Sequence, residues 1–132
     1  VDIMPEFIEN GKKMYPALEL ETADYFGQPT PETYDTIICS GALNSNFGTV
    51  EENLKFRKDA IKTMFDHTTN LVAFNMLGGH PATQNKEDSN IWYSDSLEIL
   101  EYCMSLTRRV IMRHHYHPTD FTIFMYKVKK EI

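Results

Sequence analysis

Apolar positions near the start of the chain recur at helical spacing. Pro5 suits a first helical turn, and the residues that mark one face follow it: Phe7, Ile8, Gly11, Met14 and Tyr15. Pro16 ends this helix. Alternating apolar and acidic residues over 18–22 predict a strand that ends at Asp24, and the prolines of 27–33 predict a loop.

Two apolar runs in the middle of the chain predict buried strands. Residues 34–39 form the first run and residues 71–74 the second, as strands covered on both faces would. Between them, Thr49 and Glu52 match a capping box. The helix that follows, to about Asp66, carries an apolar face made of Val50, Leu54, Ile61, Met64 and Phe65.

The second apolar run leads into residues 75–80, and from there to about Ser94 the chain is polar and irregular apart from residues 91–93. A loop of this length in a compact domain is usually functional or disordered. Asp95 or Ser94 can cap a helix whose apolar residues are Leu97, Leu100, Cys103 and Met104. Residues 107–112 and 121–128 are strand-like, and their connection is too short for a helix, so we expect antiparallel neighbours.

This order of elements predicts an α/β fold. Strands that alternate with helices favour a mostly parallel sheet with helices on both faces, and the last strand should be antiparallel. The net charge of −6 argues against a nucleic-acid partner, and no apolar stretch approaches the roughly 18 residues of a membrane span. Cys39 and Cys103 sit in apolar patterns, so we expect buried free thiols in a reducing, cytoplasmic setting.

A mostly parallel sheet that ends in an antiparallel hairpin resembles the Rossmann-like fold of class I S-adenosylmethionine-dependent methyltransferases. The family's last strand is inserted antiparallel. The segments that carry the resemblance follow the family's order: Val1-Asp2-Ile3 for the acidic end of the second strand, 23–25 for the loop after the third, 34–41 for the fourth strand and its exit, 73–77 for the fifth, and 106–110 with 121–127 for the closing strands.

The family's glycine-rich loop after the first strand has no counterpart here. The six glycines form no G-x-G-x-x-G pattern. The resemblance therefore implies a truncated domain: residues 1–132 would be a single partial methyltransferase-like domain that lacks a strand–helix unit of roughly 30 residues or more. Loss of that central strand would expose sheet edges, so we expect a homodimer contact there or a rearranged sheet.

The resemblance implies S-adenosylmethionine as the cofactor and assigns residues to its adenosine. Asp2 would accept both ribose hydroxyls, and Ile3 would contact the adenine. Asp24 would accept from the adenine amino group, with the backbone of Tyr25 nearby. The alternatives are that Asp2 is an exposed acid at a helix N-terminus and that Asp24 is an ordinary turn aspartate.

Ser40 and Gly41 fall where the cofactor's amino-acid end would meet the sheet. A small residue there allows close approach of the backbone, although a tight turn needs glycine as well. Asn44 and Asn46 are candidates to line an acceptor pocket, or they are turn formers.

Residues after the fifth strand of the family could form the wall of a substrate pocket. Asn75, His80, Trp92 and Tyr93 are the candidates, and a hydrophobic plug over the sheet end is the alternative. His80 is the only histidine that we consider as a general base, and no catalytic residue is assigned. The histidines of 114–117 are better explained by a polar hairpin than by a metal site.

The leading hypothesis is a methyltransferase that moves a methyl group from S-adenosylmethionine to an unidentified acceptor, most simply a small molecule. These 132 residues alone are expected to be inactive. The first alternative is a non-catalytic folded fragment or interaction module derived from the same fold. The second is a nicotinamide or flavin Rossmann protein, which predicts an all-parallel end to the sheet, and the short 113–120 connection speaks against it.

Overall fold

The computed structural model describes residues 1–127, which divide into two compact units. Unit 1 is Val1–Glu32, and unit 2 begins at Thr33. Val128, which falls inside the predicted last strand, lies outside the described residues. No helix in residues 1–127 is long and apolar enough to cross a bilayer.

Unit 1 contains one helix, α1 (Pro5–Met14), with a non-helical segment on either side of it. Its two flanking segments meet at one parallel bridge, where Asp2 N donates to Glu21 O over 3.2 Å and Ala23 N donates to Asp2 O over 3.0 Å. The strand predicted for residues 18–22 is therefore wrong except at Thr22. A strand needs several consecutive backbone pairs with a neighbour, and the segment around Asp2 supplies only this bridge.

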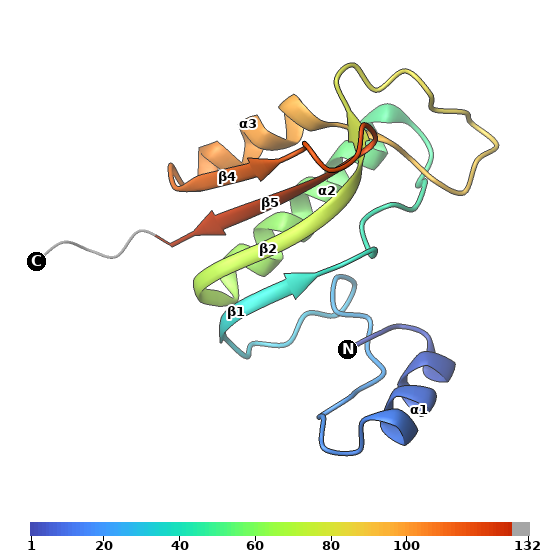
Figure 1. The fold of residues 1–132 in the computed structure, drawn as a ribbon, viewed down its shortest axis with the longest axis vertical. Helices are drawn as coiled ribbons and strands as arrows, with labels where there is room; N and C mark the ends of the chain where they lie inside the picture. Colours follow the sequence, from blue (N-terminus) through green and yellow to red (C-terminus); the bar gives the residue numbers. More distant parts are fainter. Residues whose placement is uncertain (128–132) are drawn as a thin grey trace, which may run out of the picture. The chain divides into compact units, whose positions relative to one another are not determined.

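Unit 2 is built on a sheet with the strand order β1-β2-β5-β4 (Figure 1). Its strands are β1 (Tyr34–Cys39), β2 (Thr68–Gly79), β4 (Val110–Arg113) and β5 (Asp120–Tyr126). β1 runs parallel to β2, whereas β5 lies antiparallel between β2 and β4. A short strand, β3 (Ser94–Asp95), pairs in parallel with the end of β2. The predicted mostly parallel sheet with an antiparallel C-terminal strand is confirmed.

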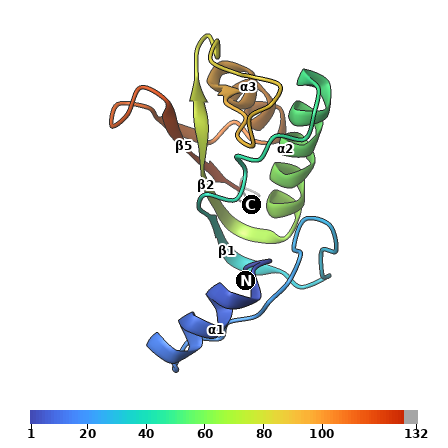
Figure 2. The same cartoon turned by 90° about the vertical axis from the view of Figure 1, so that its right-hand side faces the viewer.

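Two helices of unit 2, α2 (Val50–Asp66) and α3 (Ser96–Leu106), lie side by side on the same face of its sheet, whereas the prediction placed helices on both faces (Figure 2). The capping box at the start of α2 is confirmed, because Thr49 Oγ1 accepts from Glu52 N and Glu52 Oε2 accepts from Thr49 N. The core between helices and sheet is apolar and buried: Ile61, Met64, Val72, Phe74, Met76, Ile99, Phe121, Ile123 and Met125.

β1 is an edge strand, and the prediction that it is covered on both faces is wrong. Within residues 33–127 its only neighbour is β2. Ile38 is 76% exposed, and Cys39 is only partly buried, in contrast to the prediction of a buried thiol. Cys103 is fully buried as predicted, and both cysteines are free. An apolar run thus shows the tendency to form a strand but not how many neighbours the strand acquires.

Several strand boundaries differ from the prediction because backbone pairing between strands sets them. The buried face of α3 also differs from the prediction. β2 extends past residue 74 to Gly79, since β5 pairs with it as far as Leu77. The closing strands are shifted from 107–112 to 110–113 and from 121–128 to 120–126. On α3 the buried side chains are Ser96, Ile99 and Cys103, whereas the predicted Leu97 and Met104 are exposed.

Substitution of two isoleucines on the neighbouring strands β5 and β4 tests which side chains of the sheet belong to the buried core. Ile123 is 0% exposed, and Ile111 is 46% exposed. Ile123→Ala should lower the free energy of unfolding by about 2–5 kcal/mol, because it leaves a cavity in the core. Ile111→Ala, the matched control, should lower the free energy of unfolding by less than about 1 kcal/mol, mostly because alanine has a lower strand propensity. Urea unfolding measures both, and equal costs would contradict this description of the core.

Candidate functional site

The predicted adenosine-binding residues all belong to unit 1. The parallel bridge between Asp2 and Thr22 places the ends of both segments, and with them Asp2 and Asp24, at the same end of this unit. Each acid also has a local role: Asp2 Oδ1 accepts from Met4 N over 2.9 Å, and Asp24 Oδ1 accepts from Gly27 N over 3.0 Å. Ile3 is exposed, and the partly buried Tyr25 ring packs edge-on against Phe26 with centroids 5.3 Å apart.

Ser40 and Gly41 lie directly after β1, at the carboxyl end of the strand. Gly41 has a φ of 74°, which residues with a side chain adopt at a cost, and beyond Gly41 and its two chain neighbours no heavy atom lies within 4 Å of the place a Cβ would occupy. Gly41 N donates to Asn75 Oδ1 over 2.8 Å. The structure thus brings Gly41 and Asn75 together, although Asn75 lies within β2 and not on the predicted loop.

Asn44 and Asn46 connect segments that are distant in sequence. Asn44 Oδ1 accepts from Leu77 N over 2.9 Å, and its backbone oxygen accepts from Trp92 N over 2.9 Å. Asn46 Nδ2 donates to Ser89 O over 2.8 Å. Both asparagines therefore hold the long loop against the exit of β1, and neither lines the pocket described below.

His80 is paired with the acid that begins α3. Its Nδ1 lies 3.0 Å from Asp95 Oδ2, and Asp95 Oδ1 accepts from Leu97 N and Glu98 N over 3.0 and 3.2 Å. Partial burial by itself raises the pKa of the Asp95 carboxyl. Hydrogen bonds from Glu98 N and His80, the charge of His80 and the bond from Leu97 N outweigh this effect and bring the pKa below its ordinary value. The carboxylate therefore orients the imidazole of His80.

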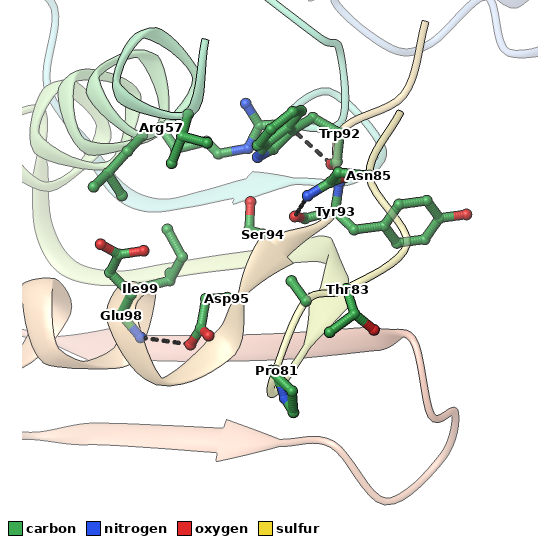
Figure 3. A pocket seen from close by; sticks show the side chains of 13 residues that line it. Arg57, Pro81, Thr83, Asn85, Trp92, Tyr93, Ser94, Asp95, Glu98 and Ile99 are labelled. Carbon is green, nitrogen blue, oxygen red and sulfur yellow. Dashed lines mark hydrogen bonds between the residues drawn. The ribbon is translucent and has the colours of Figure 1, made fainter. Parts of the chain in front are cut away.

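A pocket of about 430 Å³ lies between α2, α3 and the loop that follows β2 (Figure 3). Trp92 and Tyr93, both predicted as substrate residues, line it together with Asp95 and Glu98. Asn75 and His80 do not line it, although His80 contacts its wall through Asp95. Asn85 shapes the loop here, since it exchanges two hydrogen bonds with the backbone of Tyr93.

Arg57 is the pocket residue that the sequence analysis missed. It is 1% exposed, and its guanidinium donates to Ser45 O over 3.0 Å and to Trp92 O over 3.2 Å. Its other terminal nitrogen donates to the backbone and side-chain oxygens of Asn53, each over 3.2 Å. Burial lowers the pKa of Arg57 to about 10, so the side chain stays charged at neutral pH.

The sequence did contain a signal for Arg57. Residues 53, 57, 61 and 64 follow helical spacing, and Ile61 and Met64 belong to the buried face of α2. A polar residue on such a stripe must find partners inside the protein, because burying it alone is costly. Arg57 and Asn53 therefore mark the place where the helix contacts polar backbone and not the apolar core.

The histidines of the β4–β5 hairpin take part in local contacts. His114 Nδ1 lies 3.1 Å from His117 O, and His117 Nδ1 accepts from Thr119 N over 3.1 Å. In residues 1–127, no three side chains of the His, Cys, Asp and Glu types are grouped so that they could hold a metal ion.

Comparison with known proteins identifies solved structures with the same fold. No family model and no curated protein matches the sequence. The structure is similar to magnesium protoporphyrin IX methyltransferase (ChlM) from Synechocystis PCC 6803 with bound SAM, with a TM-score of 0.61 and 12% identity over 96% of this chain. It is also similar to the N-methyltransferase NodS from Bradyrhizobium japonicum WM9 in complex with S-adenosyl-L-homocysteine, with a TM-score of 0.63 and 11% identity over 97% of this chain.

These similarities show that the chain has the class I methyltransferase fold over the part that it spans. The chain covers 57% of the ChlM chain and 65% of the NodS chain. At identities of 12% and 11%, the similarity concerns the fold and does not carry residue roles from one protein to the other.

The pairing of Asp95 predicts a stability that depends on pH. Because the native pKa of Asp95 is lowered, its contribution is complete above the ordinary value of about 3.9 and is lost as the pH falls through the native pKa. Asp95→Ala should cost about 1 kcal/mol or more at pH 7, since it also removes the N-cap of α3. Urea unfolding from neutral to strongly acidic pH should show this difference shrinking. A constant difference would contradict the prediction, and the exposed-loop control Asp88→Ala should stay within about 0.5 kcal/mol of wild type.

Proposed function

We propose that this chain binds S-adenosylmethionine and takes part in the transfer of its methyl group to an acceptor. The observation that supports the proposal best is the position of β5, antiparallel between β2 and β4 in a sheet shared with two methyltransferases solved with SAM or SAH. In open α/β sheets, ligands bind outside the carboxyl ends of the strands. Ser40 and Gly41 lie at such an end.

The residues at the strand ends suit this cofactor. The open space above Gly41 allows a ligand to approach the backbone closely, and Ser40 beside it is exposed. In unit 1, Asp2 and Asp24 lie at the ends of two bridged parallel segments, as the carboxylates for a ribose and an adenine would. We therefore keep Asp2, Ile3, Asp24 and Tyr25 in unit 1, and separately Ser40 and Gly41 in unit 2, as candidate contacts of the cofactor.

When bound, S-adenosylmethionine supplies an electrophilic methyl group on a sulfonium. The part of the protein is to hold the acceptor in line with that group, and such positioning lowers a barrier substantially. His80, which does not line the pocket but pairs with Asp95 in its wall, is the candidate base for an acceptor that needs deprotonation. When His80 Nδ1 carries the proton and donates it in a hydrogen bond to the Asp95 carboxylate, Nε2 is unprotonated and can act as the base.

The acceptor that we propose is a small molecule. Trp92 and Tyr93 line a pocket of about 430 Å³, which is within the size range of small-molecule sites. The net charge of −6 disfavours a nucleic-acid acceptor.

The alternative is a folded module that binds no cofactor. It is favoured by the absence of a G-x-G-x-x-G motif from these 132 residues, because that loop holds much of the ligand in nucleotide-binding α/β folds. A direct binding measurement separates the two hypotheses.

Calorimetric titration with S-adenosylhomocysteine tests the proposal. We expect a dissociation constant on the order of micromolar. Asp2→Asn keeps an oxygen for Met4 N but loses the charge and one acceptor for the ribose, so it should weaken binding about tenfold or more. The control Asp88→Asn should bind like wild type. Absence of binding at millimolar ligand would favour the non-catalytic module, and equal affinity of Asp2→Asn would remove Asp2 from the site.

Alanine substitutions at two glycines with positive φ distinguish the effect of backbone strain from the effect of lost ligand contact. Gly41 and Gly48 have φ values of 74° and 119°, so alanine at either position should lower stability by about 1 kcal/mol or more, and at Gly48 its methyl group would also displace the Glu52 carboxylate. Only Gly41→Ala should weaken S-adenosylhomocysteine binding, because its methyl group would enter the space at the end of β1. Thermal unfolding and calorimetry of both variants test this, and equal loss of affinity would argue against a cofactor at Gly41.

A further inference from the structure

We propose that the pocket between α2 and α3 binds a small monocarboxylate with an aromatic or alkyl body, whose carboxylate accepts from Arg57 Nε and Ser94 Oγ. This inference names the chemical class of the acceptor, and to that extent it rests on the proposed function. The binding itself requires no methyl donor.

The first argument is the uncompensated charge of Arg57. Its terminal nitrogens donate to four oxygens, all of them neutral carbonyl or amide oxygens of Ser45, Asn53 and Trp92. In residues 1–127, no carboxylate forms an ion pair with Arg57. A buried charge without a partner of opposite sign is costly, so an anionic ligand would gain an interaction that the protein itself does not supply.

The second argument is a pair of buried polar atoms without a partner. Arg57 Nε and Ser94 Oγ make no hydrogen bond with any of residues 1–127, and Ser94 is 4% exposed. Both residues line the pocket, where the Ser94 hydroxyl points into the space near Arg57 and Trp92 (Figure 3). Buried polar groups nearly always have partners, and leaving one without costs about 1–3 kcal/mol.

The chemistry of these two atoms selects the ligand group. Arg57 Nε can only donate, and the Ser94 hydroxyl can donate as well. A carboxylate is an acceptor with two oxygens, so it can satisfy both groups and neutralise the guanidinium at once. An ammonium group would find no acceptor on Arg57 and would meet the like charge of its guanidinium.

The remaining walls define the body of the ligand. Leu54, Pro81, Trp92 and Ile99 offer apolar surface, and about 430 Å³ accommodates a single substituted ring. Asp95, which pairs with His80, also lines the pocket, as does Glu98, which forms no ion pair in residues 1–127. A second carboxylate on the ligand would meet this like charge, so the pocket should prefer monocarboxylates to dicarboxylates.

The test is titration with phenylacetate in the absence of any methyl donor, followed by proton–nitrogen NMR. Trp92 is the single tryptophan of the chain, so its indole N–H gives one signal, and Arg57 Nε–H reports the proposed hydrogen bond. Both signals should shift with ligand. Phenylacetate should bind at least about tenfold more tightly than 2-phenylethanol, which has the same body without the charge. 2-Phenylethylamine should bind more weakly than either, and phenylmalonate more weakly than phenylacetate.

Variants locate the binding. Ser94→Ala should weaken phenylacetate about fivefold, since it removes one hydrogen bond, whereas Glu98→Gln should strengthen it by removing a like charge. Ser105→Ala, at the other end of α3, is the matched control and should not change the affinity. Ser94 is changed in preference to Arg57, because Arg57 also holds the carbonyl groups of Ser45 and Trp92.

Three results would overturn the inference: no shift of either signal at about 20 mM phenylacetate, equal affinity for phenylacetate and 2-phenylethanol, or unchanged affinity in Ser94→Ala. The outcome is independent of the cofactor titration. Binding of phenylacetate without binding of S-adenosylhomocysteine would support the carboxylate site and contradict the proposed function. The reverse result would contradict the carboxylate site alone.

Discussion

The pairing of β2 on both of its edges is the constraint on which unit 2 depends. β2 pairs with β1 on one side and β5 on the other, and α2 and α3 both pack on it. Val72, Phe74 and Met76 face the buried side, while Asn75 lies between them in the alternation. A shift of one residue in register would place Asn75 in the core and expose the apolar residues, so the register is strongly specified.

The end of β2 also positions the candidate site. Gly78 pairs with Ser94 of β3, and a Cβ at Gly78 would clash with the Ser94 backbone oxygen. Only glycine allows this approach, which brings Ser94 to the wall of the pocket and Asp95 to the start of α3. Arg57, which also lines the pocket, binds the carbonyl groups of Ser45 and Trp92 in two loops. The pocket is therefore held by backbone contacts and not by apolar packing alone.

The sequence predicted the elements whose signals are local. The start of α2 followed from Thr49 and Glu52, and the N-cap of α3 followed from Asp95, because a capping side chain bonds backbone only a few residues away. The hairpin of β4 and β5 followed from a connection too short for a helix. The resemblance to class I methyltransferases rested on the order of these elements, and the shared fold agrees with it.

Partners that are distant in sequence were decided by the tertiary structure alone. The apolar run of residues 34–39 predicted a strand. Only the sheet showed that it is an edge strand with Ile38 exposed, because an apolar pattern carries no information on how many strands lie beside it. Trp92 and Tyr93 were singled out from the sequence, but Arg57 and Ser94 were not, because they meet in the pocket only after α2 and β3 pack against β2. The sequence by itself determined which segments form helices and strands, through spacing and caps that act over a few residues. The tertiary structure decided which polar atoms remain without a partner at the site, because that depends on every group that packing brings near them.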